Sequence, residues 1–506
     1  MRNARPDPDP RSIRRPLLTL FCVVLAAATA GGASPRRVEE PVPAIPARPN
    51  ILVLFTDDQR ADALGAYGNP YLRTPTLDSL AHRGFNFREA HIMGSHHGAV
   101  CAPSRAMLMS GRTLFHVYDD LDGVETFPEV LGREGYVTFG TGKWHQSRES
   151  FARSFQHGRH VFFGGMSDHG AVPVQDRLPD GTFSEVETRG FSTDLFVDAS
   201  IEFLEKHAAS DAAPPFLAYV AFTAPHDPRT PPEEYQKMYA GAGQPLPSNF
   251  MPVHPFHNGW MTGRDEQLAA WPREPEVIRE QIGEYYGLIS HVDARIGDLF
   301  ETLQRTGLAD ETIVVFASDN GLALGSHGLL GKQSLYEHST RVLLIVAGPG
   351  IPVGESHALV TLYDLFPTIA GLTGVDLPDG VEGHDLSVLW RGEARRVRET
   401  LYTAYEDKMR AVRDGRYKLI RYPPLDHVQL FDLERDPFEL RNLGDDPDYA
   451  EEKARLTTLL ESHHDALEDP HPLVTDEKAS MEFDYESIER QPDRHQPAWV
   501  VKKYFR

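Results

Sequence analysis

A cysteine followed four residues later by an arginine forms the most reactive pattern in the sequence. Residues 101–111 read CAPSRAMLMSG. Pro103 suits the first turn of a helix, so Cys101 is expected at a helix N-terminus. That end of a helix favours anions and developing negative charge. Arg105 lies one helical turn further along, and its guanidinium can reach back towards residue 101. A nucleophile, a helix N-terminus and a cation together indicate an anion-binding site.

Two pairs of oxygen-bearing side chains each follow a short apolar run. Asp57-Asp58 comes after the run 51–55, and Asp319-Asn320 comes after the run 313–317. Such runs fit strands buried on both faces. In an open parallel sheet, ligands bind beyond the carboxyl ends of the strands. Hard oxygen ligands suit calcium or magnesium. Either pair alone is as well explained by a turn, so the prediction of a metal site depends on their convergence.

The elements that would position these residues alternate along the chain. Two further apolar runs cover 216–222 and 342–347, and helical spacing covers 194–207 and 285–303. The alternation predicts an α/β fold with a large, mostly parallel sheet flanked by helices.

After about residue 385 the pattern changes to short strands with turns between them, including the hairpin signal at 414–415. A smaller C-terminal antiparallel sheet with one packed helix is expected there. The strands are expected at 401–405, 409–412, 417–421 and 429–433, and the helix at 451–467.

A length of 506 residues predicts more than one domain. The expected parts are a signal peptide at 1–33, a linker at 34–49, a catalytic domain at 50–385, and a C-terminal subdomain with a tail at 386–506.

The N-terminus has the composition of an export signal, with arginines before the apolar run 17–28 and small residues after it. The run is short for a membrane span. We therefore expect an exported protein, periplasmic or secreted, with no stable membrane span.

Charge and cysteine content narrow the partners. The formal net charge is -23, which argues against a nucleic-acid partner. An anionic substrate would have to be held by local cations. If Cys22 leaves with the signal, Cys101 stands alone. A lone cysteine in an oxidising compartment is either buried and inert or has a special function.

Two segments resemble the signatures of the type I formylglycine-dependent sulfatases of the alkaline phosphatase superfamily. Residues 101–111 match Cys-x-Pro-Ser-Arg followed by Leu or Met, Ser or Thr, and Gly, and residues 135–145 (GYVTFGTGKWH) match the second signature. The similarity extends from about Asn50 to about Leu443. Within the family, the chain resembles bacterial polysaccharide and choline sulfatases. It implies an alkaline-phosphatase-like fold and sulfuric ester hydrolysis.

The resemblance also implies a cofactor set. A maturation enzyme would oxidise Cys101 to formylglycine, whose hydrated aldehyde attacks sulfur. One calcium ion would be bound by a formylglycine oxygen of residue 101 and by four further side chains. These are Asp57, Asp58, Asp319 and Asn320.

Catalytic roles are implied for five further residues. Lys143 and Lys332 would hold sulfate oxygens, and Arg105 would stabilise the hydrated aldehyde and cover the anion. His226, with Lys332, would assist the leaving alcohol. His145 would take a proton from the second hydroxyl, which releases sulfate and restores the aldehyde.

Two other functions stay open. A formylglycine-dependent phosphonate monoester hydrolase or phosphodiesterase is one, but such relatives tend to carry His where this chain has Asn320. Imidazole suits transition metals, whereas an all-oxygen set suits calcium. An inactive protein that binds sulfated glycans is the other, and retention of the whole catalytic set argues against it.

The substrate is expected to be a sulfated sugar or glycan fragment, among organic sulfate esters. Residues 254–260 with Arg264 and Asp265 are interpreted as a loop that either holds a sugar or only packs on the domain. Whether four histidines line the substrate pocket is equally open. They are His96, His97, His327 and His338.

Overall fold

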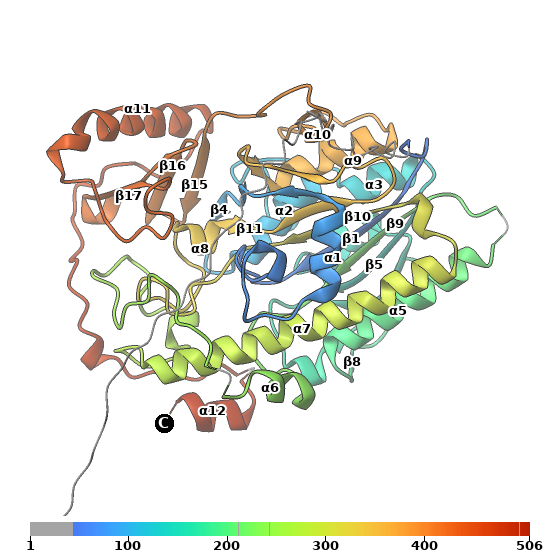
Figure 1. Ribbon diagram of the computed structural model, residues 1–506, viewed down its shortest axis with the longest axis horizontal. Coiled ribbons are helices and arrows are strands. Elements are labelled where there is room, and N and C mark those ends of the chain that lie inside the picture. Colours follow the sequence, from blue (N-terminus) through green and yellow to red (C-terminus); the bar gives the residue numbers. More distant parts are fainter. Residues whose placement is uncertain (1–43, 211, 242, 495, 506) are drawn as a thin grey trace, which may run out of the picture. The chain divides into compact units, whose positions relative to one another are not determined.

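The computed structural model describes residues 44–210, 212–241, 243–494 and 496–505 (Figure 1). The expected signal peptide, Cys22 and the linker up to residue 43 lie outside the described residues. Among the described helices, none is both long enough and apolar enough to cross a membrane.

An eight-stranded sheet forms the centre of the catalytic region, in the order β13-β2-β12-β10-β1-β9-β5-β6. Five neighbouring strands from β10 to β6 are parallel, which confirms the predicted fold class. These are β10 (Thr312–Ser318), β1 (Asn50–Thr56), β9 (Phe216–Ala221), β5 (Val137–Lys143) and β6 (His157–Phe162).

The remaining strands of this sheet extend it beyond β10. The apolar run at 342–347 divides into β11 (Arg341–Val342) and β12 (Leu344–Ala347), and β12 is antiparallel to β10. Next to it lie β2 (Phe85–Phe87) and β13 (Gly354–Ser356). The strand pattern was therefore correct for this run, but it held no information on direction.

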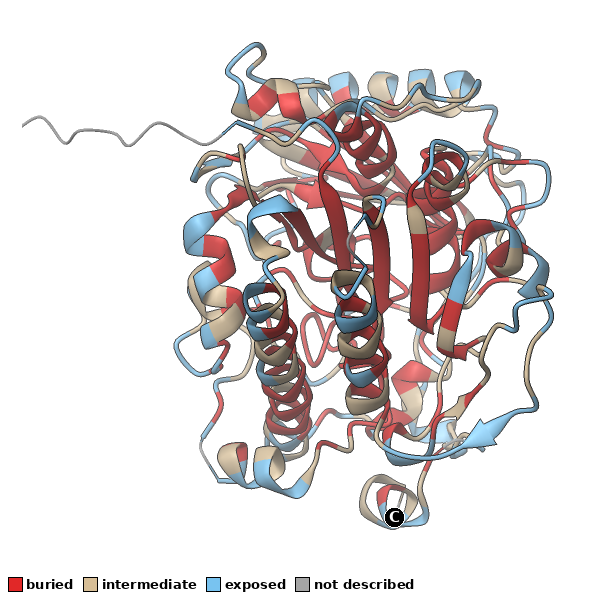
Figure 2. Cartoon of the chain, turned by 90° about the vertical axis from the view of Figure 1, so that its right-hand side faces the viewer, coloured by how far each residue is buried: buried red, intermediate tan, exposed pale blue. Residues whose placement is uncertain are grey.

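Helices cover both faces of the sheet because side chains alternate along each strand. In β1, Leu52 and Leu54 pack on one side and Ile51, Val53 and Phe55 on the other. The sheet is buried between the two layers (Figure 2). The first layer contains α1 (Pro75–Arg83), α5 (Ser192–Ala208) and α7 (Pro275–Arg305). The second contains α2 (Cys101–Ser110), α3 (Phe127–Arg133) and α9 (Leu365–Thr373).

Helix α7 begins ten residues earlier than the helical spacing predicted, at Pro275 instead of residue 285. Proline is well suited to the first position of a helix, since the N–H that it lacks has no partner there.

The C-terminal sheet has the predicted antiparallel strands, and α11 (Ala450–Ala466) packs against β16 and β17. Its order is β18-β17-β16-β15-β4. The four predicted strands are β15 (Leu401–Tyr405), β16 (Met409–Arg413), β17 (Tyr417–Tyr422) and β18 (His427–Asp432). The predicted boundary at residue 385 stays a prediction, since α10 (Ser387–Trp390) still contacts α9 and β13.

The fifth strand of the C-terminal sheet comes from the N-terminal half of the chain. β4 (Gly94–Ser95) pairs with β15 in parallel, with Gly94 opposite Ala404. Gly94 has φ 98°, and a Cβ atom there would lie 1.8 Å from the Ala404 carbonyl oxygen. Only glycine fits this close approach. The strand leads directly into α2 and thus into Cys101.

A buried ionic cluster joins the C-terminal sheet to a small sheet of β11, β3 (Ala90–His91) and β14 (Val360–Thr361). We call it the inter-sheet cluster. Glu337, the first residue of α8 (Glu337–Thr340), is 2.8 Å from Arg413 and 3.0 Å from Lys418. Lys418 is also 2.9 Å from Glu439. Further members are Glu89 and His91.

Candidate active site

Most of the predicted site residues follow the carboxyl ends of parallel strands, at one edge of the sheet. The register of β1 and β10 places Thr56 beside Ser318. Asp57 and Asp319 therefore leave the sheet at the same level, and the Asp58 N–H donates to Asp319 Oδ1 at 3.0 Å. Lys143 ends β5, and His226 lies five residues beyond β9. The edge predicted from the apolar runs is where these residues meet.

Cys101 is the first residue of α2, as predicted. Its Sγ atom lies 3.3 Å from Lys143 Nζ and from His145 Nδ1, and 3.8 Å from Lys332 Nζ. The helix N-terminus thus faces the same sheet edge. Burial raises the pKa of the Cys101 thiol, although Lys143 and Lys332 oppose the shift. The unmodified side chain is therefore a neutral thiol at pH 7 and a weak nucleophile.

Arg105 connects two strand ends at the sheet edge through hydrogen bonds. Its guanidinium donates to Asp319 Oδ2 at 2.8 Å and 3.1 Å, and to the Lys143 carbonyl oxygen at 2.8 Å. The side chain is 1% exposed. Sequence spacing predicted a reach towards residue 101, whereas the observed hydrogen bonds are to Asp319 and Lys143. The expected role in covering the anion stays a prediction.

Two buried lysines face the acidic residues. Lys143 Nζ pairs with Asp57, and Lys332 Nζ pairs with Asp58 Oδ1 at 2.6 Å. Burial would lower the pKa of Lys332, but Asp58 and Cys101 outweigh it and the pKa lies well above the usual value. Lys332 is therefore a permanent cation beside Cys101.

The acidic residues leave oxygens without partners. Among the described residues, the buried Asp57 Oδ1 and Asn320 Oδ1 have no hydrogen-bond partner. Burial and then the charge of Asp319 raise the pKa of Asp57 well above its usual value, against the effect of Lys143. Ligand atoms of Asp57, Cys101 and Asp319 all lie within 4.8 Å of one another. Buried oxygens without a hydrogen-bond partner are rare in folded proteins, and these residues fit a hard cation.

Two histidines flank the cation pair. His145 has φ 61°, and a Cβ atom at Gly165 would lie 2.7 Å from its Nε2. Gly165 therefore makes room for the ring. His226 Nδ1 is 2.7 Å from the Asp227 carbonyl oxygen, so this nitrogen carries the proton. The pKa of each histidine is well below the usual value, through burial and then Lys143 for His145 and Lys332 for His226.

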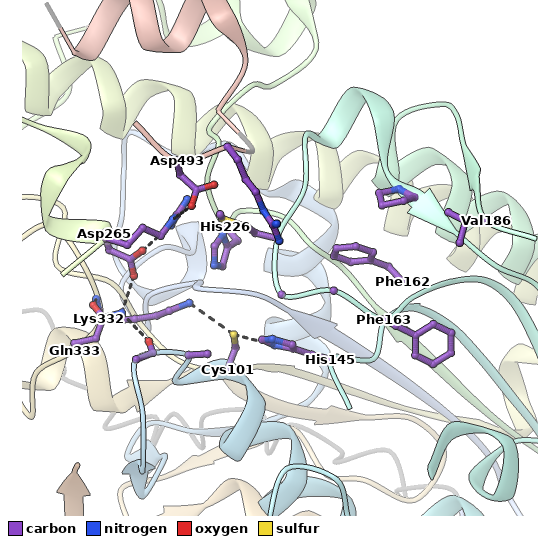
Figure 3. Close-up of a pocket in the computed structure, with 18 of the residues that line it drawn as sticks. Cys101, His145, Phe162, Phe163, Val186, His226, Asp265, Lys332, Gln333 and Asp493 are labelled. Carbon is purple, nitrogen blue, oxygen red and sulfur yellow. Dashed lines mark hydrogen bonds and ion pairs between the residues drawn. The ribbon is translucent and has the colours of Figure 1, made fainter. Parts of the chain in front are cut away.

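A cavity of about 620 Å³ opens above Cys101 (Figure 3). Cys101, His145, His226 and Lys332 lie at its base. Its walls are aromatic and charged. They include Phe162, Phe163, Trp260, Arg148, Arg264, Asp265, Asp493 and Arg494.

Sequence reasoning missed the wall that follows β6. Phe162 ends this strand, Phe163, Gly164 and Gly165 follow it, and all four line the cavity. The signal was available, since an apolar run that ends in Gly-Gly marks one more strand end at the ligand-binding edge. Asp493 and Arg494 had no such signal, because they lie in a tail without periodicity.

The loop formed by residues 254–260 with Arg264 and Asp265 has two roles. Trp260, Arg264 and Asp265 line the cavity. His254 and Phe256 are buried, and Phe256 packs against Tyr422 of the C-terminal sheet. The loop thus both packs and faces the cavity.

The four histidines that were left open do not line this cavity in the described chain. His96 and His97 line a separate one, His338 lines a third, and His327 is buried against Tyr336.

Comparison with known proteins identifies the family. The Sulfatase family model matches residues 49–375, and the model for the C-terminal region of N-sulphoglucosamine sulphohydrolase matches residues 325–466. The chain belongs to the sulfatase family. Arylsulfatase A of Bos taurus is 31% identical to this sulfatase, over 83% of the chain and 88% of the relative. The chain is a sulfuric ester hydrolase.

Two further matches cover nearly the whole length of this sulfatase. The N-acetylglucosamine-6-O-sulfatase of Bacteroides thetaiotaomicron is 26% identical over 92% of the chain and 93% of the relative. A solved structure of a protein in complex with its substrate D-glucosamine-2-N,6-O-disulfate has a TM-score of 0.71 at 24% identity. It covers 84% of this sulfatase and 99% of that chain, and it confirms the fold.

Proposed function

We propose that this sulfatase releases sulfate from a sulfated saccharide outside the cytoplasm, with formylglycine at residue 101 and one bound calcium ion. One observation carries the proposal. Cys101 stands at a helix N-terminus with Lys143 Nζ at 3.3 Å, Lys332 Nζ at 3.8 Å, and buried oxygens without partners beside it.

Asp57, Asp58, Asp319 and Asn320 would hold the metal. Bound calcium supplies positive charge that favours an ionised oxygen on residue 101 and neutralises charge on the sulfate. Arg105 fixes the orientation of Asp319 through two hydrogen bonds. The all-oxygen donor set is the reason for preferring calcium to a transition metal.

Oxidation of Cys101 to formylglycine, followed by addition of water to the aldehyde, would supply a hydroxyl nucleophile in place of a neutral thiol. Lys143 and Lys332 bind the sulfate oxygens and stabilise the charge that develops on them. His226, with Lys332, assists the leaving alcohol through Nε2, because Nδ1 is held by the Asp227 carbonyl. The lowered pKa leaves Nε2 without a proton in the free site, and the negative charge of a bound sulfate ester favours the protonated ring that can donate. His145 Nδ1 lies 3.3 Å from Cys101 Sγ. From this position it takes the proton that leaves the hydroxyl group of the hydrated residue 101.

The saccharide assignment has two supports. One is the nearly full-length similarity to the N-acetylglucosamine-6-O-sulfatase. The other is the cavity, where Phe162, Phe163 and Trp260 offer apolar faces and Arg264 and Asp265 offer polar groups. Sites of this composition suit small ligands with one apolar face and several hydroxyl groups.

The deciding experiment measures sulfate released by matured protein from sulfated saccharides, aryl sulfates and choline sulfate, with a phosphodiester beside them. We expect release from one saccharide class, loss of activity in Cys101→Ala, and an aldehyde mass at residue 101. Phosphodiester cleavage without sulfate release would overturn the proposal.

Export and maturation are tested separately. Cell fractionation and sequencing of the mature N-terminus should place the protein outside the cytoplasm with residues 1–33 removed. Co-expression with a formylglycine-generating enzyme should raise the specific activity, and unchanged activity would contradict the assigned maturation partner.

A further inference from the structure

The C-terminal tail returns from the C-terminal subdomain to the catalytic domain. After α11 it follows the loop that precedes α7, where the His257 N–H donates to the Met481 carbonyl at 2.8 Å and Phe483 packs on Trp271. We call residues 489–494 and 496–505 the strap. The two matching family models end at residues 375 and 466, so the strap lies outside the regions that they match.

The strap is anchored at a distance from the active site. Its helix α12 (Ala498–Tyr504) lies beside α6 (Glu233–Tyr239) and α7, away from α11 (Figure 1). Lys503 Nζ and the Tyr504 hydroxyl both donate to the buried Glu284 carboxylate of α7. A charged hydrogen-bonded pair with a buried partner holds such a segment more firmly than a surface ion pair.

Between its start and this anchor, the strap contacts groups next to His226. Gln496 is 8% exposed, and its side-chain N–H donates to Asp227 Oδ2 at 3.2 Å. Arg264 bonds both Asp227 and Asp265, and its Nε lies 3.6 Å from Asp493 Oδ2. Asp227 follows His226 directly, and its backbone carbonyl oxygen accepts a hydrogen bond from His226 Nδ1. The strap therefore contacts the charged residues that surround His226, a proposed catalytic residue.

The strap also forms part of the cavity wall. Asp493 and Arg494 line the cavity that contains Cys101. Asp493 lies on the opposite side of the cavity from Cys101, with His226 between them (Figure 3). Val186, which directly precedes β8 (Glu187–Thr188), and Trp260 line other parts of the cavity. At about 620 Å³ the space has the size of a small-ligand pocket.

We propose that the strap is a specificity element that restricts this sulfatase to sulfate groups on the terminal unit of a saccharide chain. The inference rests on the proposed function. An internal sulfate would require the chain to continue past the sulfated unit on both sides, and the strap lies across the cavity opposite the base where sulfate is held. A terminal unit is joined to the rest of the saccharide on one side only, so the chain has to leave the cavity in only one direction.

The test compares two substrates that differ in chain length and in whether the sulfated unit is terminal or internal. One is a disaccharide with 6-O-sulfate on its non-reducing unit, and the other is a hexasaccharide with the same sulfate on an internal unit. Lys503→Ala with Tyr504→Phe releases the anchor without altering the cavity. Lys502→Ala, an exposed change in the same helix, is the matched control.

We expect the parent to prefer the terminal sulfate by at least about tenfold in kcat/KM. Releasing the anchor should lower this ratio at least about fivefold by raising turnover of the hexasaccharide, and the Lys502 control should keep the parent ratio. Equal rates on both substrates in the parent, or an unchanged ratio after release of the anchor, would overturn the inference.

Binding to Cys101→Ala, measured by calorimetry on the same two saccharides, separates this inference from the proposed function. Terminal-only binding without sulfate release by the matured protein would remove the hydrolase assignment and retain the strap. Hydrolysis without selectivity would remove the strap and retain the hydrolase. A lack of both binding and hydrolysis would overturn both.

Discussion

The charges at the sheet edge and those of the inter-sheet cluster are buried to a similar degree, but they are compensated differently. At the edge, Asp57 and Asn320 each keep an oxygen without a hydrogen-bond partner among the described residues. In the inter-sheet cluster, Arg413 and Lys418 lie within 3.0 Å of the Glu337 carboxylate. Two oxygens of this cluster, Glu89 Oε2 and Glu439 Oε1, also lack a hydrogen bond, but each is ion-paired, with Arg413 at 3.0 Å and Lys418 at 2.9 Å. The first site opens to a cavity of about 620 Å³ and the second to one of about 10 Å³.

The difference shows which cluster is built for a ligand. A buried oxygen without a partner destabilises the fold unless something binds it. Removal of one member of a compensated buried pair leaves the other charge uncompensated. Substitutions at the sheet edge should therefore affect turnover and metal binding, whereas those in the inter-sheet cluster should affect the free energy of unfolding.

Loss of the nucleophile should give the largest effect. Cys101→Ala should reduce sulfate release by at least about a thousandfold, since no other group in the cavity replaces it. The free energy of unfolding should fall by about 1 kcal/mol or less, because the change removes one small buried atom. Steady-state kinetics and denaturant titration measure the two quantities. A large loss of stability would contradict the assignment of the edge to catalysis.

Glu337→Gln should give the largest effect on stability. It leaves Arg413 and Lys418 buried without their shared carboxylate, and breaking such a pair costs about 3–5 kcal/mol. Turnover per folded molecule should be retained. The matched control is Glu355→Gln, an exposed partner of Arg88, where the expected loss is below about 1 kcal/mol. Equal losses in the two variants would remove the distinction between the clusters.

Acid should destabilise the protein through buried histidine while Glu337 stays ionised. Burial lowers the pKa of His254 from 6.5 to about 4. As pH falls from 6.5 to about 4, the unfolded chain takes up a proton that the folded chain does not, so stability falls by at most about 3 kcal/mol. Arg413 and Lys418 outweigh burial and hold the pKa of Glu337 well below 4.5, so it stays ionised at pH 4.5 and above.

Denaturant titrations at pH 7 and pH 4.5 test this point. His254→Gln should reduce the difference between the two pH values, and the exposed His82→Gln should not. An unchanged difference in His254→Gln would show that another group causes the loss of stability in acid.

Calcium should stabilise the metal-free protein by about 2.7 kcal/mol at a concentration of one hundred times its Kd. Differential scanning fluorimetry should show the shift in Glu337→Gln and in the exposed control Asp62→Asn. It should be absent from Asp57→Asn and Asn320→Ala, which alter the oxygens without partners. A calcium shift that survives both of these substitutions would place the metal elsewhere.

The sequence predicted the sheet edge better than the walls of the cavity. Asp57, Asp319 and Cys101 carry local signals, because strand ends and helix starts are defined by neighbouring residues. The walls come from segments that meet only in the folded chain. Trp260 and Asp493 are far apart in sequence, and no period or turn signal connects them to residue 101.

Strand direction was equally hidden. The run 342–347 has the composition of a buried strand, and its antiparallel pairing with β10 depends on the path of the connecting chain. The family resemblance supplied residues that patterns alone did not, including Lys143 and Lys332.

The pairing of β4 with β15 bears on when the proposed oxidation of Cys101 can take place. The segment that leads into Cys101 completes its sheet only after residues 401–405 have been synthesised. At translation rates of about 5–20 residues per second, the intervening 300 residues take roughly 15–60 s. In the folded chain Cys101 is 2% exposed. A maturation enzyme of the kind proposed for this thiol would therefore have to act before the chain folds, because the folded chain buries Cys101.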